Sequence, residues 1–266
     1  MGTIARYNVP APMSIHVASL PLSPLALMRE ARVVFARSLG FAVAATLALV
    51  LGGVVRTLPG IVGLMLFTGL VIALERLLAG NHPHPRLGAA NRITLARAGV
   101  ACLIASRALD PAPLGMMERW TLAALAGTAL MLDGTDGWAA RRQRLTSPFG
   151  ARFDMEIDAF GIAVLALTVV RADIVPCWVL AIGAMRYLYL TAGRVFPVLR
   201  RQPPTCAFAD RRRKAIAVIQ SLALLCSLVP VTPPNWAVAT CALALGLLVY
   251  SFAADIRMLL FAKPLR

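Results

Sequence analysis

Residues 131–158 read MLDGTDGWAARRQRLTSPFGARFDMEID and lie between two long apolar runs. Four aspartates stand within this stretch: Asp133, Asp136, Asp154 and Asp158. The first two are three residues apart and the last two are four residues apart, so each pair shares one face of a helix. Ser147-Pro148, between the pairs, is typical of a helix start. The stretch therefore predicts two helices joined by a short turn, each with an acidic face.

The chain around this stretch consists mainly of apolar runs. Its 266 residues are 59% hydrophobic and only 15% charged, and the mean hydropathy is +0.75, whereas a soluble domain is about a quarter charged. Runs of roughly 20 apolar residues cross a bilayer as helices, and the run from Phe41 to Val55 has no polar face to meet water. We therefore predict an all-α polytopic membrane protein. Its eight apolar segments cover roughly residues 38–55, 60–79, 92–109, 119–139, 149–170, 174–194, 214–230 and 235–256.

The net charge of +15 would suit a nucleic-acid-binding protein, but the basic residues gather at the ends of the apolar segments. That placement favours cytoplasmic loops and anionic lipid headgroups, so we expect a lipid bilayer and no nucleic acid as partner. With the N-terminus inside, four arginines fall outside: Arg56, Arg107, Arg119 and Arg171. The loops 140–152 and 195–214 are then cytoplasmic. The Ala- and Arg-rich composition is typical of a bacterial inner (plasma) membrane protein.

Folding residues 131–158 about Leu145 brings the two acidic faces to the same depth. Asp136 and Asp154 are each nine residues from Leu145, and the outer two aspartates are twelve and thirteen residues away; the rise is about 1.5 Å per residue. Four uncompensated carboxylates in a membrane would cost on the order of 10 kcal/mol, so we expect cations. Carboxylate oxygens favour Mg²⁺ or Mn²⁺. We predict two such ions in one cavity, a few turns beneath the cytoplasmic surface.

Two oxygen-bound divalent ions beside arginines and a glycine indicate phosphoryl transfer on a diphosphate, with a carboxylate to accept the proton of an attacking hydroxyl. Two other classes of protein also use aspartates in membranes. An aspartate-rich prenyltransferase places its Asp clusters on distant helices, whereas one hairpin holds both pairs here. An ion-coupled transporter does not require the glycine and arginine positions, and the sequence shows no inverted repeat.

The residues of this stretch also carry a family pattern. The pattern is Asp133-x2-Asp136-Gly137-x2-Ala140-Arg141-x8-Gly150-x3-Asp154-x3-Asp158, and it resembles the signature of the CDP-alcohol phosphotransferases (CDP-alcohol phosphatidyltransferases) at every position. Upstream, residues 91–97 read NRITLAR and resemble the Asn-x2-Thr-x2-Arg segment at the start of the family's first core helix. The resemblance covers roughly residues 88–257.

The resemblance implies a six-helix membrane enzyme, usually a homodimer, whose cavity opens to the cytoplasm. Such an enzyme transfers a substituted phosphate from a CDP-alcohol to an acceptor hydroxyl and releases CMP; we expect CDP-diacylglycerol as donor, in phospholipid biosynthesis. It implies that the four aspartates bind two divalent metals and that Asp158 is also the general base. The residues that it implies for CDP binding are Asn91, Thr94, Gly137, Ala140, Arg141 and Gly150, the last by close backbone packing.

The first two apolar segments are additional to that six-helix core. We divide the chain into a cytoplasmic or interfacial segment (1–37), two additional N-terminal transmembrane helices (38–87) and the catalytic membrane domain (88–266). The first segment should contain a short surface helix that begins at Ser23-Pro24. We interpret the two extra helices as a membrane anchor.

Four further residues receive predictions of their own. Arg186 is a charge within an apolar segment, which suggests contact with the acceptor or with a phosphate. Lys214 begins the next segment, as a lysine often does in the family, and we assign it to acceptor binding as well. Glu156 should form a surface ion pair with Arg152. His82-Pro-His84 is interpreted as a loop and not as a metal site.

Overall fold

The computed structural model describes the backbone of residues 24–78, 81–84, 86–143, 147–196 and 207–261. Side chains are described for these residues except 24–25, 135–143, 207–208, 210 and 260–261. The predicted turn at Leu145 and the first 23 residues lie outside the described residues. Every regular element in the described part is helical, so the all-α prediction is confirmed.

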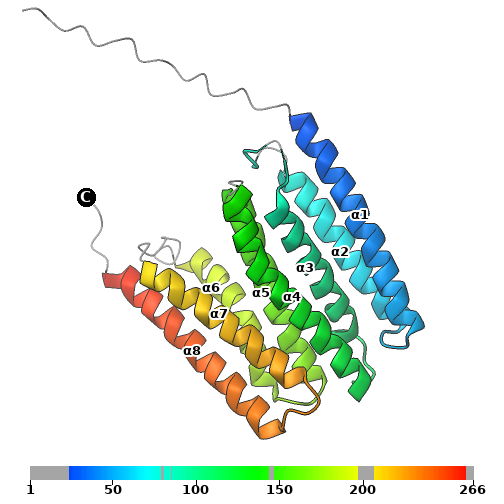
Figure 1. The fold of residues 1–266 in the computed structure, drawn as a ribbon. Coiled ribbons are helices and arrows are strands. Elements are labelled where there is room, and N and C mark those ends of the chain that lie inside the picture. The colour runs from blue at the N-terminus through cyan, green and yellow to red at the C-terminus, as the bar shows by residue number, and fades with distance from the viewer. Residues whose placement is uncertain (1–23, 79–80, 85, 144–146, 197–206, 262–266) are drawn as a thin grey trace, which may run out of the picture.

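Each of the eight predicted segments overlaps one α-helix, although several helix ends differ from the predicted boundaries (Figure 1). The helices are α1 (Pro24–Leu51), α2 (Thr57–Leu78), α3 (Ala89–Ala108), α4 (Met116–Gln143), α5 (Pro148–Arg171), α6 (Leu180–Val195), α7 (Ala207–Leu228) and α8 (Pro234–Phe261). A short 3₁₀ turn, η1 (Cys177–Val179), precedes α6. Three helical stretches in the described part are long and apolar enough to cross a membrane: Ala26–Leu51, Thr57–Leu78 and Pro234–Leu259.

Helix α1 differs from the prediction of a separate surface helix before the first span. It begins at Pro24, as expected, but continues without a break to Leu51. Gly40, three residues after the expected boundary at residue 37, does not end the helix, because a single glycine inside a helix costs only about 1 kcal/mol. The buried residues Leu27, Ala31 and Phe35 follow one another every four residues, and Ala42 extends the same stripe across the boundary.

Helix α3 lies at the centre of the packing. It contacts α1 and α2 on one side and α4 and α5 on the other, and α7 closes the space between α4 and α5 (Figure 1). Two hydrophobic clusters meet at α3 and α5: one reaches α1 and α2, and the other reaches α4, α7 and α8. Within the described part of the chain, α4 packs mainly on α3 and α7, so α3 bridges the two aspartate-bearing helices. A simple two-helix hairpin is therefore an incomplete description of the region.

Two glycines set close helix contacts around this centre. A Cβ atom on Gly63 of α2 would lie 2.6 Å from Cβ of Ser106 and 2.8 Å from the carbonyl oxygen of Cys102, both in α3. A Cβ atom on Gly183 of α6 would lie 2.5 Å from Cα of Ala163 in α5. Small residues allow helix backbones to approach in this way, so α2 is docked tightly on the helix that carries the site.

Candidate active site

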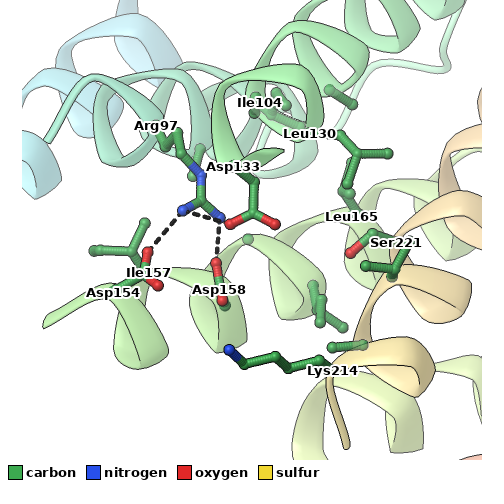
Figure 2. A pocket seen from close by; sticks show the side chains of 17 residues that line it. Arg97, Ile104, Leu130, Asp133, Asp154, Ile157, Asp158, Leu165, Lys214 and Ser221 are labelled. Carbon is green, nitrogen blue, oxygen red and sulfur yellow. Dashed lines mark hydrogen bonds and ion pairs between the residues drawn. The ribbon is translucent and has the colours of Figure 1, made fainter. Parts of the chain in front are cut away.

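Two helices bring three acidic side chains to one place. Asp133 comes from α4, and Asp154 and Asp158 come from successive turns of α5 (Figure 2). One carboxylate oxygen of each lies within 4.8 Å of the other two. We refer to Asp133, Asp154 and Asp158 as the acidic cluster. Their side chains are 30%, 38% and 36% exposed, so the cluster is half-buried and open on one side.

The guanidinium of Arg97, from α3, occupies the middle of the acidic cluster (Figure 2). Its Nη1 lies 2.9 Å from Oδ1 of Asp133 and 2.8 Å from Oδ1 of Asp154, and its Nη2 donates to Oδ1 of Asp158. Only 8% of Arg97 is exposed. One guanidinium cannot neutralise three carboxylates, so the cluster keeps an excess of negative charge that attracts further cations.

Helices α3 and α5 run in the same direction and meet in register. Three contacts follow one another from the N-terminal ends of the two helices. Asn91 faces Gly150 first. One turn further, Oγ1 of Thr94 lies 3.5 Å from Oδ1 of Asp154, and after another turn Arg97 donates to Asp158. A Cβ atom on Gly150 would lie only 2.8 Å from Oδ1 of Asn91. Glycine is therefore required at position 150 for this approach, one helical turn from the acidic cluster.

The start of α5 fixes this register. Ser147 caps the helix, because its Oγ accepts a hydrogen bond of 3.0 Å from the backbone N–H of Gly150. Pro148 occupies the first helical position, where its missing N–H is not needed. The start predicted from Ser147-Pro148 is thus confirmed, and it determines which residues of α5 face α3.

A cavity of about 330 Å³ opens beside the acidic cluster, within the usual range for small-molecule pockets. Its polar end is formed by Arg97, Lys214 and the acidic cluster. The other walls are apolar or small and come from α3, α4, α5 and α7: Ala101, Ile104, Ala126, Ala129, Leu130, Ile157, Gly161, Ile162, Leu165, Ala217 and Val218. Ser221 adds one hydroxyl to them, two turns along α7 from Lys214 (Figure 2). The cavity thus joins a charged end to an apolar one.

The family model of the CDP-alcohol phosphatidyltransferases matches residues 87–250, more than half of the chain. The chain belongs to the CDP-alcohol phosphatidyltransferase family. This membership implies a membrane-bound transferase that moves a phosphatidyl group from a CDP-alcohol to an alcohol acceptor. Comparison with curated proteins and with solved structures gives no match.

The matched region begins just before α3 and ends within α8, so α1 and α2 lie outside it. It contains the acidic cluster, the helix cap of α5 and the contact between Asn91 and Gly150. The backbone of α4 passes through Asp136, Gly137, Ala140 and Arg141, but their side chains lie outside the described residues. Their assigned contacts therefore remain predictions from the family pattern.

Lys214 lines the cavity, and its ammonium group points toward the acidic cluster (Figure 2). It does not begin a helix as predicted, because α7 starts at Ala207 and places Lys214 two turns inside it. Part of the expected loop 195–214 is therefore helical. The first two turns of α7 are rich in charged residues, so apolar runs alone do not indicate where the helix starts.

Arg186 and Glu156 form an ion pair with each other. Nη2 of Arg186 lies 2.5 Å from Oε1 of Glu156, so the predicted pairing of Glu156 with Arg152 is wrong. The reason is that α6 packs closely on α5 through Gly183, three residues before Arg186. Arg186 is not among the residues that line the cavity, and its role in acceptor binding stays a prediction.

Arg97 is the site residue to which the sequence interpretation gave no role, although it is the arginine of the Asn-x2-Thr-x2-Arg segment. It is the last residue of NRITLAR, and it lies three residues after Thr94 and six after Asn91. This spacing places all three on one face of α3, which was a usable signal. Ser221 gave no such signal, because a serine in a membrane helix commonly bonds its own backbone.

Proposed function

We propose that the protein transfers the phosphatidyl group of CDP-diacylglycerol to an acceptor hydroxyl and releases CMP, as a step of phospholipid biosynthesis. The observation that carries the proposal is the acidic cluster around Arg97, one turn below the contact between Asn91 and Gly150. Family membership supplies the reaction class. The apolar walls of the cavity suit a lipid-linked substrate.

The acidic cluster fits a divalent metal site. Its three carboxylates supply oxygen ligands within 4.8 Å of one another and are partly open to solvent, and such ligands suit Mg²⁺ or Mn²⁺. We propose that these aspartates, with Asp136, hold two such ions. When bound, the ions would neutralise the diphosphate and lower the pKa of the acceptor hydroxyl.

Asp158 is the proposed general base. It is the deeper of the two aspartates of α5, and it lies next to the apolar wall formed by Gly161, Ile162 and Leu165. The acceptor oxygen would form a bond to the phosphorus of the phosphatidyl group while the bond from that phosphorus to CMP breaks. A carboxylate oxygen of Asp158 would take the hydroxyl proton. Arg97, which donates to Asp158, would keep this carboxylate in position.

The nucleotide is proposed to bind near the N-terminal ends of α3 and α5, away from Asp158. We propose that CDP approaches where Asn91 faces the bare Cα of Gly150, with Thr94 one turn below. The family pattern adds Gly137, Ala140 and Arg141 to this end. Lys214 projects toward the acidic cluster from the opposite wall, where an ammonium group would stabilise phosphate oxygens. Nucleotide and reacting hydroxyl would thus lie on opposite sides of the metals.

The proposed setting is a bacterial inner membrane, with the site open to the cytoplasm and the chain paired as a homodimer. The excess of Lys and Arg in loops on one side supports the orientation. Reaction of an impermeant thiol reagent with single cysteines introduced into the loops on either side would test it in intact cells. A homodimer should appear as a doubled mass in detergent.

The test is release of CMP by the purified full chain from a panel of CDP-alcohols. CDP-diacylglycerol should be the active donor, in the presence of Mg²⁺ or Mn²⁺ and one of several acceptors: glycerol phosphate, inositol phosphate, serine or a lipid alcohol. Chelation of the metal should stop the reaction. If no CDP-alcohol yields CMP with any acceptor, the proposed function is wrong.

A further inference from the structure

The loop between α2 and α3 touches the first turn of α5. His82 lies in this loop, and its Nδ1 is 3.3 Å from Oγ of Ser147, the cap of α5. Its Nε2 lies 2.9 Å from the carbonyl oxygen of Arg86. The imidazole also meets the ring of Phe149 edge-on, with the centroids 5.8 Å apart. A residue outside the matched family region therefore contacts the start of the helix that carries two of the aspartates.

The hydrogen bonds of His82 define one consistent tautomer. The carbonyl of Arg86 only accepts, so Nε2 of His82 carries the proton and Nδ1 is left as an acceptor. The hydroxyl of Ser147 then donates to Nδ1, while its oxygen accepts the N–H of Gly150 at 3.0 Å. His82, Ser147 and Gly150 thus form a continuous chain from the loop to the close-approach glycine.

The same loop also holds the first turn of α3. Nδ2 of Asn91 donates to the carbonyl oxygen of Leu87 at 2.6 Å, and this turns Oδ1 of Asn91 toward Gly150. Leu87 is 1% exposed and packs in the same hydrophobic cluster as Phe149. The loop therefore fixes both sides of the contact between Asn91 and Gly150, one through Leu87 and the other through His82.

We propose that His82 is a positioning residue for the nucleotide end of the site. Through Ser147 it sets the place of Gly150 relative to Asn91, and with it the space into which CDP fits; the inference rests on the proposed function. His82 does not touch the acidic cluster, which begins one turn further along α5 at Asp154. Its effect should therefore fall on nucleotide affinity and not on the metal response.

The test is the affinity of the purified full chain for CDP, measured by calorimetry with Mn²⁺ present. One net hydrogen bond corresponds to about a three- to tenfold change in an equilibrium constant, so His82→Ala should weaken CDP binding by about that factor. The amide oxygen of His82→Asn replaces Nδ1, one bond from Cγ, and should keep the affinity within about twofold of wild type. His82→Gln reaches only toward Arg86 and should behave like His82→Ala.

Two controls separate positioning from general stability. Asn81→Ala changes an exposed residue of the same loop, whose amide bonds Leu77 in α2, and should leave CDP affinity unchanged. In a Ser147→Ala background, the further change of His82 to alanine should have little effect, because both residues act through one contact. The stabilisation of each variant by Mn²⁺ should match that of the wild type.

The outcomes are distinct. Equal CDP affinity in all His82 variants, or a His82→Asn variant as weak as His82→Ala, overturns the proposal. If His82→Ala does not fold, the comparison of His82→Asn with His82→Gln decides it. Failure of the wild-type protein to bind CDP would instead overturn the proposed function.

Discussion

Two arginines of the same helix show how one residue type serves two purposes. Arg97 and Arg107 lie ten residues apart on α3, about 15 Å along its axis. Both are at least nine-tenths buried. Arg97 faces three carboxylates beside a cavity, whereas Arg107 faces one carboxylate and two loop carbonyls.

The surroundings of Arg107 are balanced. Its Nη1 donates to the carbonyl oxygen of Ala112 at 3.1 Å, and its Nη2 lies 2.8 Å from Pro113 O and from Oε2 of Glu118. The pair of charges cancels, and the contacts hold the loop between α3 and α4. Around Arg97 three carboxylates exceed the two positive charges of Arg97 and Lys214, and the excess faces a cavity. The difference indicates that uncompensated buried charge, and not buried charge alone, distinguishes the functional end of α3.

The largest expected effect is on turnover. Asp158→Asn removes the proposed proton acceptor and should lower the rate of CMP release by about 10²- to 10⁴-fold, with a smaller change in CDP affinity. The measurement is CMP release under saturating metal, together with CDP binding. The matched control is Glu118→Gln, which changes the carboxylate paired with Arg107 and should leave the rate per folded molecule unchanged. CMP release at the wild-type rate in Asp158→Asn would rule out the base assignment.

The next largest effect is on the free energy of unfolding, and it arises at the ion pair of Arg107 and Glu118. Arg107→Ala leaves the carboxylate of Glu118 without its cation, with only the N–H of Gly115 as a partner, and should lower the free energy of unfolding by about 3–5 kcal/mol. Unfolding in denaturing detergent, followed by circular dichroism, measures it. Arg56→Ala is the control, because this exposed arginine only approaches Asp110 at 3.8 Å and should cost less than about 1 kcal/mol. A changed metal requirement in folded Arg107→Ala would contradict a purely structural role.

A smaller effect should reveal the charge excess itself. Arg97→Ala leaves the acidic cluster without its internal cation, so the protein should be less stable in a chelator and should gain more from Mg²⁺ or Mn²⁺ than the wild type, by about 1–2 kcal/mol. Arg92→Ala is the control: Arg92 lies on α3 like Arg97, but it forms an exposed ion pair with Glu30 of α1. An identical metal response in Arg97→Ala and the wild type would show that the cluster does not bind the metal.

The smallest effect is a pH dependence of the free energy of unfolding that arises at His82. Burial lowers the pKa of His82 below its ordinary value of 6.5, with a further lowering by His84, against the opposing bond to the Arg86 carbonyl. The unfolded chain therefore binds the proton more readily, so the contribution of neutral His82 is complete above pH 6.5 and is lost as the pH falls below that value. The free energies of unfolding of the wild type and of His82→Asn, which keeps the bond to Ser147 but does not titrate, should be similar near about pH 7.5 and diverge toward about pH 5, with the wild type becoming the less stable. Parallel curves would contradict this.

The sequence predicted much of this arrangement because the signals were local. Apolar runs located all eight helices, and Ser147-Pro148 gave the start of α5. The spacing of the aspartates placed Asp154 and Asp158 on one helix face, and the structure brings Asp133 to the same place. Errors arose where partners come from other helices: Glu156 pairs with Arg186 across α5 and α6, which spacing within α5 does not reveal.

The amino-acid sequence by itself determined the helices, the family and the acidic residues, because helix periodicity and motif spacing depend only on neighbours along the chain. Only the tertiary structure decided that α3 lies between the aspartate-bearing helices, that Arg97 enters the acidic cluster and that His82 meets the cap of α5. These contacts join residues about 36 to 65 positions apart. They depend on how closely the helices pack. Glycines such as Gly63 and Gly150 permit the close approach, but the approach involves two helices and cannot be read from either segment alone.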